Sequence, residues 1–378
     1  MKKYLFTITF IVASIATIFV WFNQVSADAS SNNLSDISVG GRSIENGETI
    51  KVYGFQPTIA GSTDSSSTMT ISLTASGQSP IIANLSADGA GDFSFTPSSE
   101  LEKATYILSI ISTDPHGNVT AFSGSLVMKQ NHVIGALIKK SSNDTVYLVQ
   151  SGTKVPIPSA TAFLSHNFPW AEVLTLNSDE VDFYSNGSHL TIRNGTLVKS
   201  SSSDTVYVIQ GTSKRPFPTA DIFLDLGYGW DSIYTSSDAE LSGYTTGSLM
   251  AASSQHLPGT LIKLSSSDTV YLLEQDGSLK TRGVPSASVF LSQGFRWEDI
   301  IAVTQTELDT YTDGDLLVFR DGTLVKATSG DTVYVIESEK KRAFVSGTVF
   351  TGLGYDWSNV LEVPSTELTA ITAGDNII

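Results

Sequence analysis

The chain has 378 residues, of which 40% are hydrophobic and 16% are charged, a composition typical of a globular protein with roughly two to four domains. Its formal net charge of −16 argues against a nucleic-acid partner, because phosphate binding relies on clustered Lys and Arg side chains. The absence of cysteine excludes disulfides, thiolate chemistry and cysteine-ligated metals.

Residues 1–27 have the pattern of an export signal. Lys2 and Lys3 precede an apolar run over residues 4–21, and Val25 and Ala27 have the small-residue spacing that a signal peptidase accepts. We expect cleavage after Ala27. The alternative is an uncleaved membrane anchor, because the apolar run is longer than the usual signal core. In both cases the rest of the chain is expected to be extracellular or at the cell surface, and only an uncleaved segment would contact the membrane.

Residues 33–129 predict a β-sandwich. In "TMTISLTA", apolar Met69, Ile71 and Leu73 alternate with polar residues, which indicates a strand with one face on a core. The stretches "PTIAGST", "SADGAGDFSFTP" and "ATYILSIISTDPHGNVT" resemble, in order, the bacterial Ig-like domains of cell-surface and secreted proteins. The resemblance implies a spacer or adhesive module without catalytic residues. Asp114 is interpreted as a turn residue, because one carboxylate falls far short of the roughly six to eight oxygens that calcium takes.

A single phrase recurs four times in the rest of the chain. Its copies "GALIKKSSNDTVYLVQ", "GTLVKSSSSDTVYVIQ", "GTLIKLSSSDTVYLLE" and "GTLVKATSGDTVYVIE" begin at Gly135, Gly195, Gly259 and Gly322. Self-similarity at a period of 60 to 64 residues predicts tandem structural units. We therefore divide this region into repeats 1 to 4, which span residues 135–194, 195–258, 259–321 and 322–378.

Each repeat begins with two predicted strands and continues with two short helices. In "DTVYVIQ" the apolar residues run on without alternation, which favours a strand covered on both faces. "TADIFLDLG" predicts a helix with Thr219 as N-cap and Gly227 in the left-handed conformation that ends it; the equivalent end residues are Asn167, Gly294 and Gly354. A second helix is indicated by a Glu three residues after Asn177, Ser237 and Thr304, the spacing of a capping box. Repeat 4 has Pro364 there, so its second helix is expected to start differently or to fray.

The boundaries between repeats predict shared hairpins. Asn194-Gly195 and Asp321-Gly322 separate apolar stretches, and such dipeptides favour the type I′ turn that joins antiparallel strands. The last strand of one repeat is then expected to pair with the first strand of the next, and the final strand after Gly374 to be unpaired. The fold class predicted for the whole chain is mainly β: an Ig-like β-sandwich followed by four tandem small α+β repeats, each with a β-hairpin, a strand and two short helices, in an elongated array.

Residues 135–378 also resemble a tandem module of exported bacterial proteins, through "GTLVK", "DTVYVIQ", "KRPFP" and "FLDLGYGW" in this order. The resemblance implies no activity. Repeats 1, 3 and 4 depart from "KRPFP" with "KVPIP", "KTRGVP" and "KRAFV", which puts a common role for this basic segment in doubt. The basic dipeptides Lys214-Arg215 and Lys341-Arg342 suit either an acidic wall polymer or a solvated hairpin face.

The polar residues of the recurring phrase are one Lys and one Asp per repeat: Lys139, Lys199, Lys263 and Lys326 with Asp144, Asp204, Asp268 and Asp331. We interpret them as surface ion pairs rather than as metal ligands or catalysts. The five histidines share no repeat position, and the chain contains no nucleophile elbow, Walker loop or HExxH motif. We therefore predict no enzymatic activity, no catalytic residues, no cofactor and no metal site.

Aromatic residues are the sharpest functional lead. Every repeat has a Trp, and another aromatic residue stands two positions before it, which yields the pairs Phe168 and Trp170, Tyr228 and Trp230, Phe295 and Trp297, and Tyr355 and Trp357. Core packing is the expected role, because a unit of this size needs large side chains to fill its interior. The alternative role is stacking on a sugar ring, with the same residues as glycan contacts.

These observations leave three hypotheses for function. The leading hypothesis is an exported, non-catalytic structural or spacer protein at the cell surface or in the medium, with an adhesive role. The alternative is a module that binds a cell-wall polymer, a glycan or another surface protein through the repeat aromatics. The third is an exported hydrolase, for which the sequence offers only the presence of carboxylates.

Overall fold

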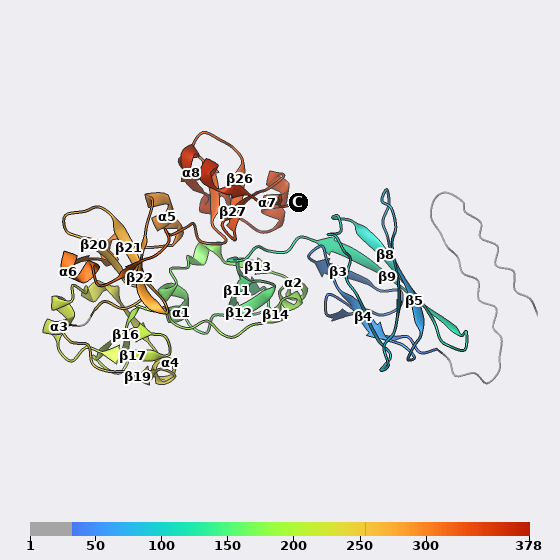
Figure 1. Cartoon of the computed structure of the whole chain (residues 1–378), viewed down its shortest axis with the longest axis horizontal. Helices are drawn as coiled ribbons and strands as arrows, with labels where there is room; N and C mark the ends of the chain where they lie inside the picture. The colour runs from blue at the N-terminus through green and yellow to red at the C-terminus, as the bar shows by residue number, and fades with distance from the viewer. Residues whose placement is uncertain (1–31, 254) are drawn as a thin grey trace, which may run out of the picture.

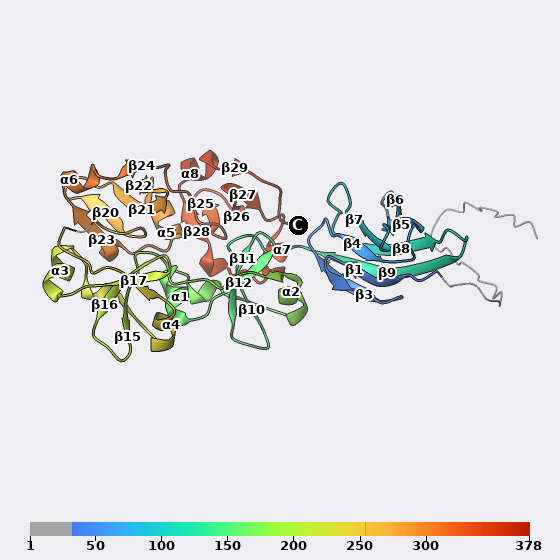
Figure 2. The same ribbon diagram turned by 60° about the horizontal axis from the view of Figure 1, so that its bottom comes forward.

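A computed structural model describes residues 32–253 and 255–378, so the predicted export signal lies outside the described residues. The molecule is elongated: a β-sandwich lies at one end and the group of repeats at the other (Figures 1 and 2). Within the described ranges, none of the helices is both long enough and apolar enough to cross a membrane. The predicted class is confirmed, because the chain is mainly β and combines a sandwich with an array of small α+β units.

Two sheets form the sandwich. One has the strand order β2-β1-β4-β7, and the other has the order β3-β9-β8-β5-β6. In chain order the strands are β1 (Ser35–Val39), β2 (Arg42–Ser43), β3 (Thr49–Tyr53), β4 (Ile59–Ser62), β5 (Thr68–Thr74), β6 (Ile81–Ser86), β7 (Asp92–Phe95), β8 (Thr105–Thr113) and β9 (Val119–Lys129). The predicted alternation in β5 is confirmed: Met69, Ile71 and Leu73 are buried in a core to which both sheets contribute.

Every repeat folds into one five-stranded sheet. In repeat 1 the strands β10 (Leu137–Lys140), β11 (Val146–Gln150) and β12 (Thr153–Pro156) are antiparallel, while β13 (Leu174–Leu176) and β14 (Ser185–Asn186) add parallel edges beside β10 and β12. Helix α1 (Ala160–Ser165) and the 3-10 helix η1 (Trp170–Glu172) connect β12 to β13, and α2 (Ser178–Phe183) connects β13 to β14.

The other three repeats have the same order of elements and the same pairing. Repeat 2 comprises β15 (Leu197–Ser200), β16 (Val206–Gln210), β17 (Ser213–Pro216), α3 (Ala220–Asp225), η2 (Trp230–Ser232), β18 (Ile233–Ser236), α4 (Asp238–Ser242) and β19 (Thr245–Thr246). Repeat 3 comprises β20 (Leu261–Leu264), β21 (Val270–Asp276), β22 (Ser278–Gly283), α5 (Ala287–Ser292), η3 (Trp297–Asp299), β23 (Ile300–Val303), α6 (Gln305–Leu308) and β24 (Thr312–Asp313). Repeat 4 comprises β25 (Leu324–Ala327), β26 (Val333–Glu337), β27 (Lys340–Ala343), α7 (Gly347–Gly352), η4 (Trp357–Asn359), β28 (Leu361–Val363), α8 (Ser365–Ala370) and β29 (Thr372–Ala373).

The predicted helix boundaries are confirmed. The Thr219 side chain accepts a hydrogen bond from the Ile222 amide at the start of α3, and Gly227 has φ +76° just beyond its end. Asn177, Ser237 and Thr304 each accept a hydrogen bond from the amide of the Glu three positions later. Helix α8 starts directly after Pro364 without any side-chain cap. The proline of repeat 4 therefore removes the cap, but the helix still forms.

The four repeats form a closed ring. Leu197 of β15 faces a core shared with repeat 3, while the next residue, Val198, faces a core shared with repeat 1. Repeat 4 packs in the same way between repeats 3 and 1, and Figure 1 shows repeat 4 lying back beside repeat 1. Both faces of every sheet are therefore covered, as the non-alternating strands predict, by the short helices of the repeat together with residues of its neighbours.

The prediction of shared hairpins is wrong. The short strand at the end of each repeat, such as β14, pairs with the third strand of its own sheet, and no strand of the described chain lies between β14 and β15. The glycine at the boundary instead allows two repeats to touch. A Cβ atom on Gly259, which has φ +91°, would lie 1.8 Å from the carbonyl oxygen of Asn194. Gly135 and Gly322 meet in the same way where repeat 4 closes on repeat 1.

The C-terminus is paired as well. Strand β29 pairs with β27, and Ile377 forms a further bridge to Phe344. The Ile377 side chain is buried in the core between repeats 4 and 1. The expectation of a weak, unpaired final strand is therefore wrong, because the strand pairs within its own sheet, as the last strand of every repeat does, and ring closure adds the burial of Ile377 against repeat 1.

Candidate functional site: four tryptophans on the ring

The tryptophan of each repeat opens the 3-10 helix and lies on the α-helix that precedes it. The ring centroids of Trp and a Phe of that helix are 3.8, 4.2, 3.7 and 4.2 Å apart in repeats 1 to 4, in a stacked arrangement. These Phe residues, which are Phe163, Phe223, Phe290 and Phe350, are fully buried. The tryptophans above them, Trp170, Trp230, Trp297 and Trp357, remain 54, 49, 53 and 52% exposed. One face of each indole covers the core, and about half of the side chain stays open.

The first members of the predicted aromatic pairs have a different environment. Phe168, Tyr228 and Phe295 are buried, and Tyr355 is largely covered. Each contacts the same helix Phe at 5.5 or 5.6 Å between centroids. The expectation of core packing is confirmed for these buried residues and is wrong for the tryptophans. The buried Phe already fills the space between helix and sheet, so the indole lies on top of it.

The recurring phrase lies beside the tryptophan in repeat 4. In repeat 4 a cleft of about 250 Å³ is lined by Trp357, by Asp331 and Thr332 of the hairpin loop, and by Ser346 and Gly347 at the start of α7. A Cβ atom on Gly347 would lie 3.3 Å from Cζ2 of Trp357, so the indole passes close to the helix N-terminus. The polar loop and the tryptophan thus form one surface in the structure. The sequence did not predict this contact, because the two features are far apart along the chain.

The predicted surface ion pair between the Lys and the Asp of the phrase forms in two of the four repeats, and among the described residues it is absent from repeats 3 and 4. Lys139 and Lys199 lie 3.2 and 3.9 Å from the exposed carboxylates of Asp144 and Asp204. Lys326 differs, because it pairs with Glu362 on the neighbouring strand at 2.7 Å.

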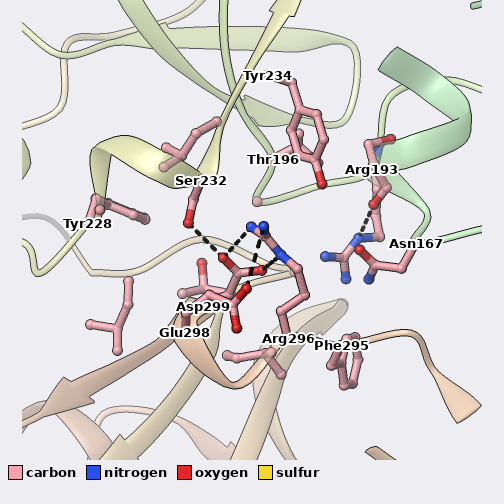
Figure 3. A pocket seen from close by; sticks show the side chains of 18 of the residues that line it. Asn167, Arg193, Thr196, Tyr228, Ser232, Tyr234, Phe295, Arg296, Glu298 and Asp299 are labelled. Carbon is pink, nitrogen blue, oxygen red and sulfur yellow. Dashed lines mark hydrogen bonds and ion pairs between the residues drawn. The ribbon is translucent and has the colours of Figure 1, made fainter. Parts of the chain in front are cut away.

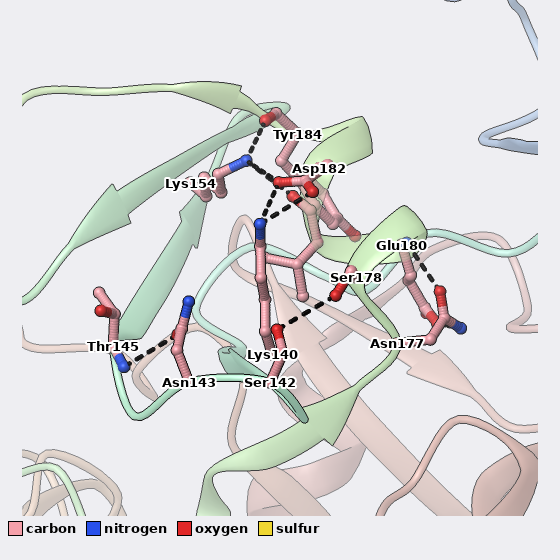
Figure 4. A network of polar contacts seen from close by, with 11 residues as sticks. Lys140, Ser142, Asn143, Thr145, Lys154, Asn177, Ser178, Glu180, Asp182 and Tyr184 are labelled. Carbon is pink, nitrogen blue, oxygen red and sulfur yellow. Dashed lines mark hydrogen bonds and ion pairs between the residues drawn. The ribbon is translucent and has the colours of Figure 1, made fainter.

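The polar network beside this loop in repeat 1 is structural (Figure 4). Asn143 accepts a hydrogen bond from the Thr145 amide and shapes the loop. Lys140 and Lys154 both reach Asp182, and their hydrogen bonds and positive charges hold the pKa of this carboxyl below its usual value. The Lys154 ammonium also donates to the carbonyl oxygens of Val181 and Tyr184, at the end of α2.

The basic dipeptides are engaged inside the protein. Lys214 donates to the carbonyl oxygens of Leu241 and Tyr244 at 2.7 Å, at the C-terminal end of α4, where a cation is favourable. Arg215 donates to backbone carbonyls of the segment that follows β19. In repeat 4, Lys341 donates to the carbonyl of Leu368, while Arg342 pairs with Glu337. These side chains hold the sheet edge to the second helix and are not available as a row of free charges.

Two histidines do share a repeat position, which the sequence analysis missed. His132 and His256 stand three residues before the glycines that open repeats 1 and 3. His256 Nε2 lies 2.7 Å from the Leu226 carbonyl of repeat 2, and its Nδ1 lies 2.5 Å from Glu307. His132 makes the equivalent contacts with Leu353 and Glu180. Counting backwards from the next glycine would have revealed the position. Both side chains bridge neighbouring repeats.

The turn interpretation of Asp114 is confirmed. Its carboxylate accepts hydrogen bonds from the amides of His116 and Asn118 and from the Asn118 side chain, at 2.7 to 2.8 Å. Burial opposes the charged form, but these hydrogen bonds outweigh it and lower the pKa of Asp114. Over residues 32–253 and 255–378, no three side chains of His, Asp or Glu are grouped closely enough to hold a metal ion.

Comparisons with known proteins leave the family open. No protein-family model and no curated protein matches the sequence. Among solved structures, CopC from Methylosinus trichosporium OB3b is 12% identical at a TM-score of 0.21, with 27% of this chain and 96% of that chain covered. The periplasmic assembly of an ESX-5 inner membrane complex is 11% identical at 0.15, with 83% and 75% covered. An ice-binding adhesin from an Antarctic bacterium is 12% identical at 0.18, with 67% and 84% covered. Likeness at these TM-scores supports no conclusion about function.

Proposed function

We propose that this chain is an exported, non-catalytic surface protein whose ring of repeats binds an uncharged polysaccharide through its four tryptophans. The β-sandwich then serves as the spacer between the ring and the rest of the cell surface. One observation carries the proposal: the indole is about half exposed in all four repeats, at 49 to 54%. A structural spacer has no need for an exposed Trp at the same place in every unit.

The tryptophans suit stacking on a sugar ring because they are held in place. Each lies on a buried Phe, so the orientation of the exposed face is set before a ligand arrives. A preorganised aromatic surface loses little conformational freedom on binding, which favours affinity. The cleft beside Trp357 adds the hydroxyl groups of Thr332 and Ser346, which suit the hydroxyls of a carbohydrate.

Charge favours an uncharged polymer over an acidic one. The net charge of −16 repels polyanions, and the basic dipeptides of repeats 2 and 4 are engaged with backbone carbonyls and carboxylates. Four similar sites on one ring also make binding multivalent, so a long polymer that reaches more than one site gains affinity without any new contact.

Retention on insoluble polysaccharide, measured with the chain from Asp28 onward, tests the proposal. Cell-wall glycan from which anionic polymers have been stripped, cellulose and chitin are suitable probes. Replacing all four tryptophans by Ala should abolish retention, while Trp357→Ala alone should weaken it by about 10-fold or less through reduced avidity. The control is Leu224→Ala with Leu291→Ala, which removes other exposed apolar side chains from α3 and α5. Equal retention of the fourfold Trp variant and this control would refute the proposal and leave the spacer hypothesis.

A further inference from the structure

Two arginines occupy equivalent positions at the centre of the ring. Arg193 and Arg320 each stand two residues before the glycine that opens the next repeat. The surroundings correspond too, because repeats 1 and 2 contact each other as repeats 3 and 4 do: Ser159 donates to Glu240 in the first pair, and Ser286 donates to Glu367 in the second. Each arginine lies over an aromatic ring on the opposite side, Phe295 for Arg193 and Phe168 for Arg320.

Arg320 has a carboxylate partner. Its Nη2 lies 3.2 Å from Glu172 in η1, and its Nη1 donates to the Asn167 carbonyl at 3.3 Å. The positive charge that repeat 3 contributes here is thus neutralised by repeat 1, as expected for a guanidinium held inside a protein.

Arg193 lacks this partner. Its Nε donates to the Ser165 carbonyl at 2.7 Å, and although the charge of Asp299 acts on it from a distance, Arg193 forms no ion pair with any residue in the described part of the chain. The residue equivalent to Glu172 is Asp299, whose shorter carboxylate is taken by Arg296 at 2.7 and 2.9 Å and by Ser232 at 2.6 Å. Repeat 1 has Pro169 in place of Arg296, so no arginine at this position competes with Arg320 for Glu172.

A small cavity lies beside Arg193, between repeats 1, 2 and 3 (Figure 3). Its volume is about 70 Å³, which exceeds the roughly 10–15 Å³ that a single water requires. Its lining includes three buried hydroxyl groups: those of Tyr228 and Thr260 lie close to each other, and that of Thr196 has no hydrogen-bond partner among the described residues. Buried polar groups in proteins are nearly always hydrogen-bonded, so the Thr196 hydroxyl points to a ligand.

We propose that this cavity binds a small monocarboxylate, of the size of acetate, through the Arg193 guanidinium and the surrounding hydroxyl groups. The ligand occupies the role that Glu172 has at Arg320. A guanidinium matches a carboxylate with two parallel hydrogen bonds. Arg296 is paired with both Asp299 and Glu298, at 2.7 and 3.7 Å, which leaves Arg193 as the cation of the cavity lining that has no ion pair. A divalent phosphate would meet the carboxylates of Asp299 and Glu298, which line the same cavity.

Calorimetric titration of the chain from Asp28 onward with sodium acetate tests this, with sodium chloride as the blank and phosphate as the divalent comparison. We expect saturable binding of acetate. Arg193→Gln should weaken it by about 10-fold or more, because the charge-assisted hydrogen bonds are lost. Arg320→Gln is the matched control and should leave acetate affinity unchanged, since its partner is Glu172.

A second variant keeps the test independent of folding defects at Arg193. Arg296→Ala frees Asp299, which then pairs with Arg193 as Glu172 pairs with Arg320. This variant should fold at least as well as the natural chain and should bind acetate at least about 10-fold more weakly. Absence of saturable acetate binding by the natural chain would overturn the proposal, as would equal affinity in the Arg193→Gln and Arg320→Gln variants, or phosphate binding more tightly than acetate.

Discussion

The sandwich and the ring solve the same burial problem in opposite ways. The sandwich builds one core between its own two sheets, with residues such as Ile71 and Leu108 fully enclosed. A repeat has one sheet and only short helices of its own, so the core on each side of the sheet is completed by a different neighbour. The comparison teaches that a structural unit visible in the sequence need not be a folding unit. The sandwich is a folding unit by itself, whereas a single repeat is not, and only the complete ring of four repeats is.

Size explains the difference. A unit of about 60 residues buries a small fraction of its surface when it folds alone, and short strands and one-turn helices add little local stability. Closing the ring lets four such units bury both sides of every sheet. An open row of the same repeats would leave one apolar face exposed at each end.

Removal of repeat 4 should have the largest effect. Truncation after Asp321 uncovers the faces of repeats 1 and 3 that contact it, so we expect the thermal transition of the whole ring to disappear or the chain to aggregate. The sandwich should still unfold in its own transition, with the midpoint of the full chain. Differential scanning calorimetry measures both. A truncated ring that melts near the natural temperature would show that the repeats are independent units.

Core truncations should separate the two regions. Phe350→Ala removes a fully buried ring and should lower the free energy of unfolding by about 3–5 kcal/mol for all four repeats together. Leu108→Ala should lower the free energy of unfolding of the sandwich by about 2–5 kcal/mol and leave the ring transition unchanged. Chemical denaturation followed by tryptophan fluorescence reports the ring, since every described Trp lies there. A split of the ring transition in Phe350→Ala would argue against cooperative closure.

Ring contacts can be tested at a single glycine. Gly259→Ala and Gly277→Ala both place a side chain at positive φ, +91° and +75°, and share that backbone strain of about 1–2 kcal/mol. Only Gly259 faces another repeat, where its Cβ would lie 1.8 Å from the Asn194 carbonyl oxygen. We expect Gly259→Ala to destabilise the ring by about 1–3 kcal/mol more than Gly277→Ala, measured by urea denaturation. Equal losses would mean that the crossing is not tightly packed.

Acid should weaken the ring through His166. Burial lowers the pKa of His166 to about 4 from the ordinary 6.5, so the unfolded chain takes up the proton first as pH falls. Stability is therefore complete above about pH 6.5 and declines between pH 6.5 and 4, by roughly 2–3 kcal/mol. In His166→Gln this decline should be reduced, because Gln does not titrate. Gln should also replace the contact of His166 Nε2 with the Thr191 carbonyl, at 2.9 Å, since Gln293 at the equivalent position of repeat 3 donates to the Val318 carbonyl at 2.8 Å. The sandwich transition is the internal control. An unchanged pH profile would assign the acid sensitivity to other groups.

The features that the sequence determined by itself are those with local causes. The alternation in β5 depends on the two-residue period of a strand, the caps at Thr219 and Asn177 on side chains three residues from their partners, and the end of α3 on the left-handed conformation of Gly227. The non-alternating strands even indicated that both sheet faces are covered. Such patterns repeat in every copy because each is complete within a few residues.

Tertiary structure alone decided which surfaces meet. Nothing local distinguishes a glycine that opens a hairpin from Gly259, which lets another backbone approach, and nothing local shows that Phe290 fills the core while Trp297 remains half exposed above it. The lone charge of Arg193 depends on Asp299 and Arg296, more than 100 residues away in the chain. These properties follow from the packing of one repeat on another, which is set by the shapes and charges of whole faces and has no counterpart in the spacing of residues along the chain.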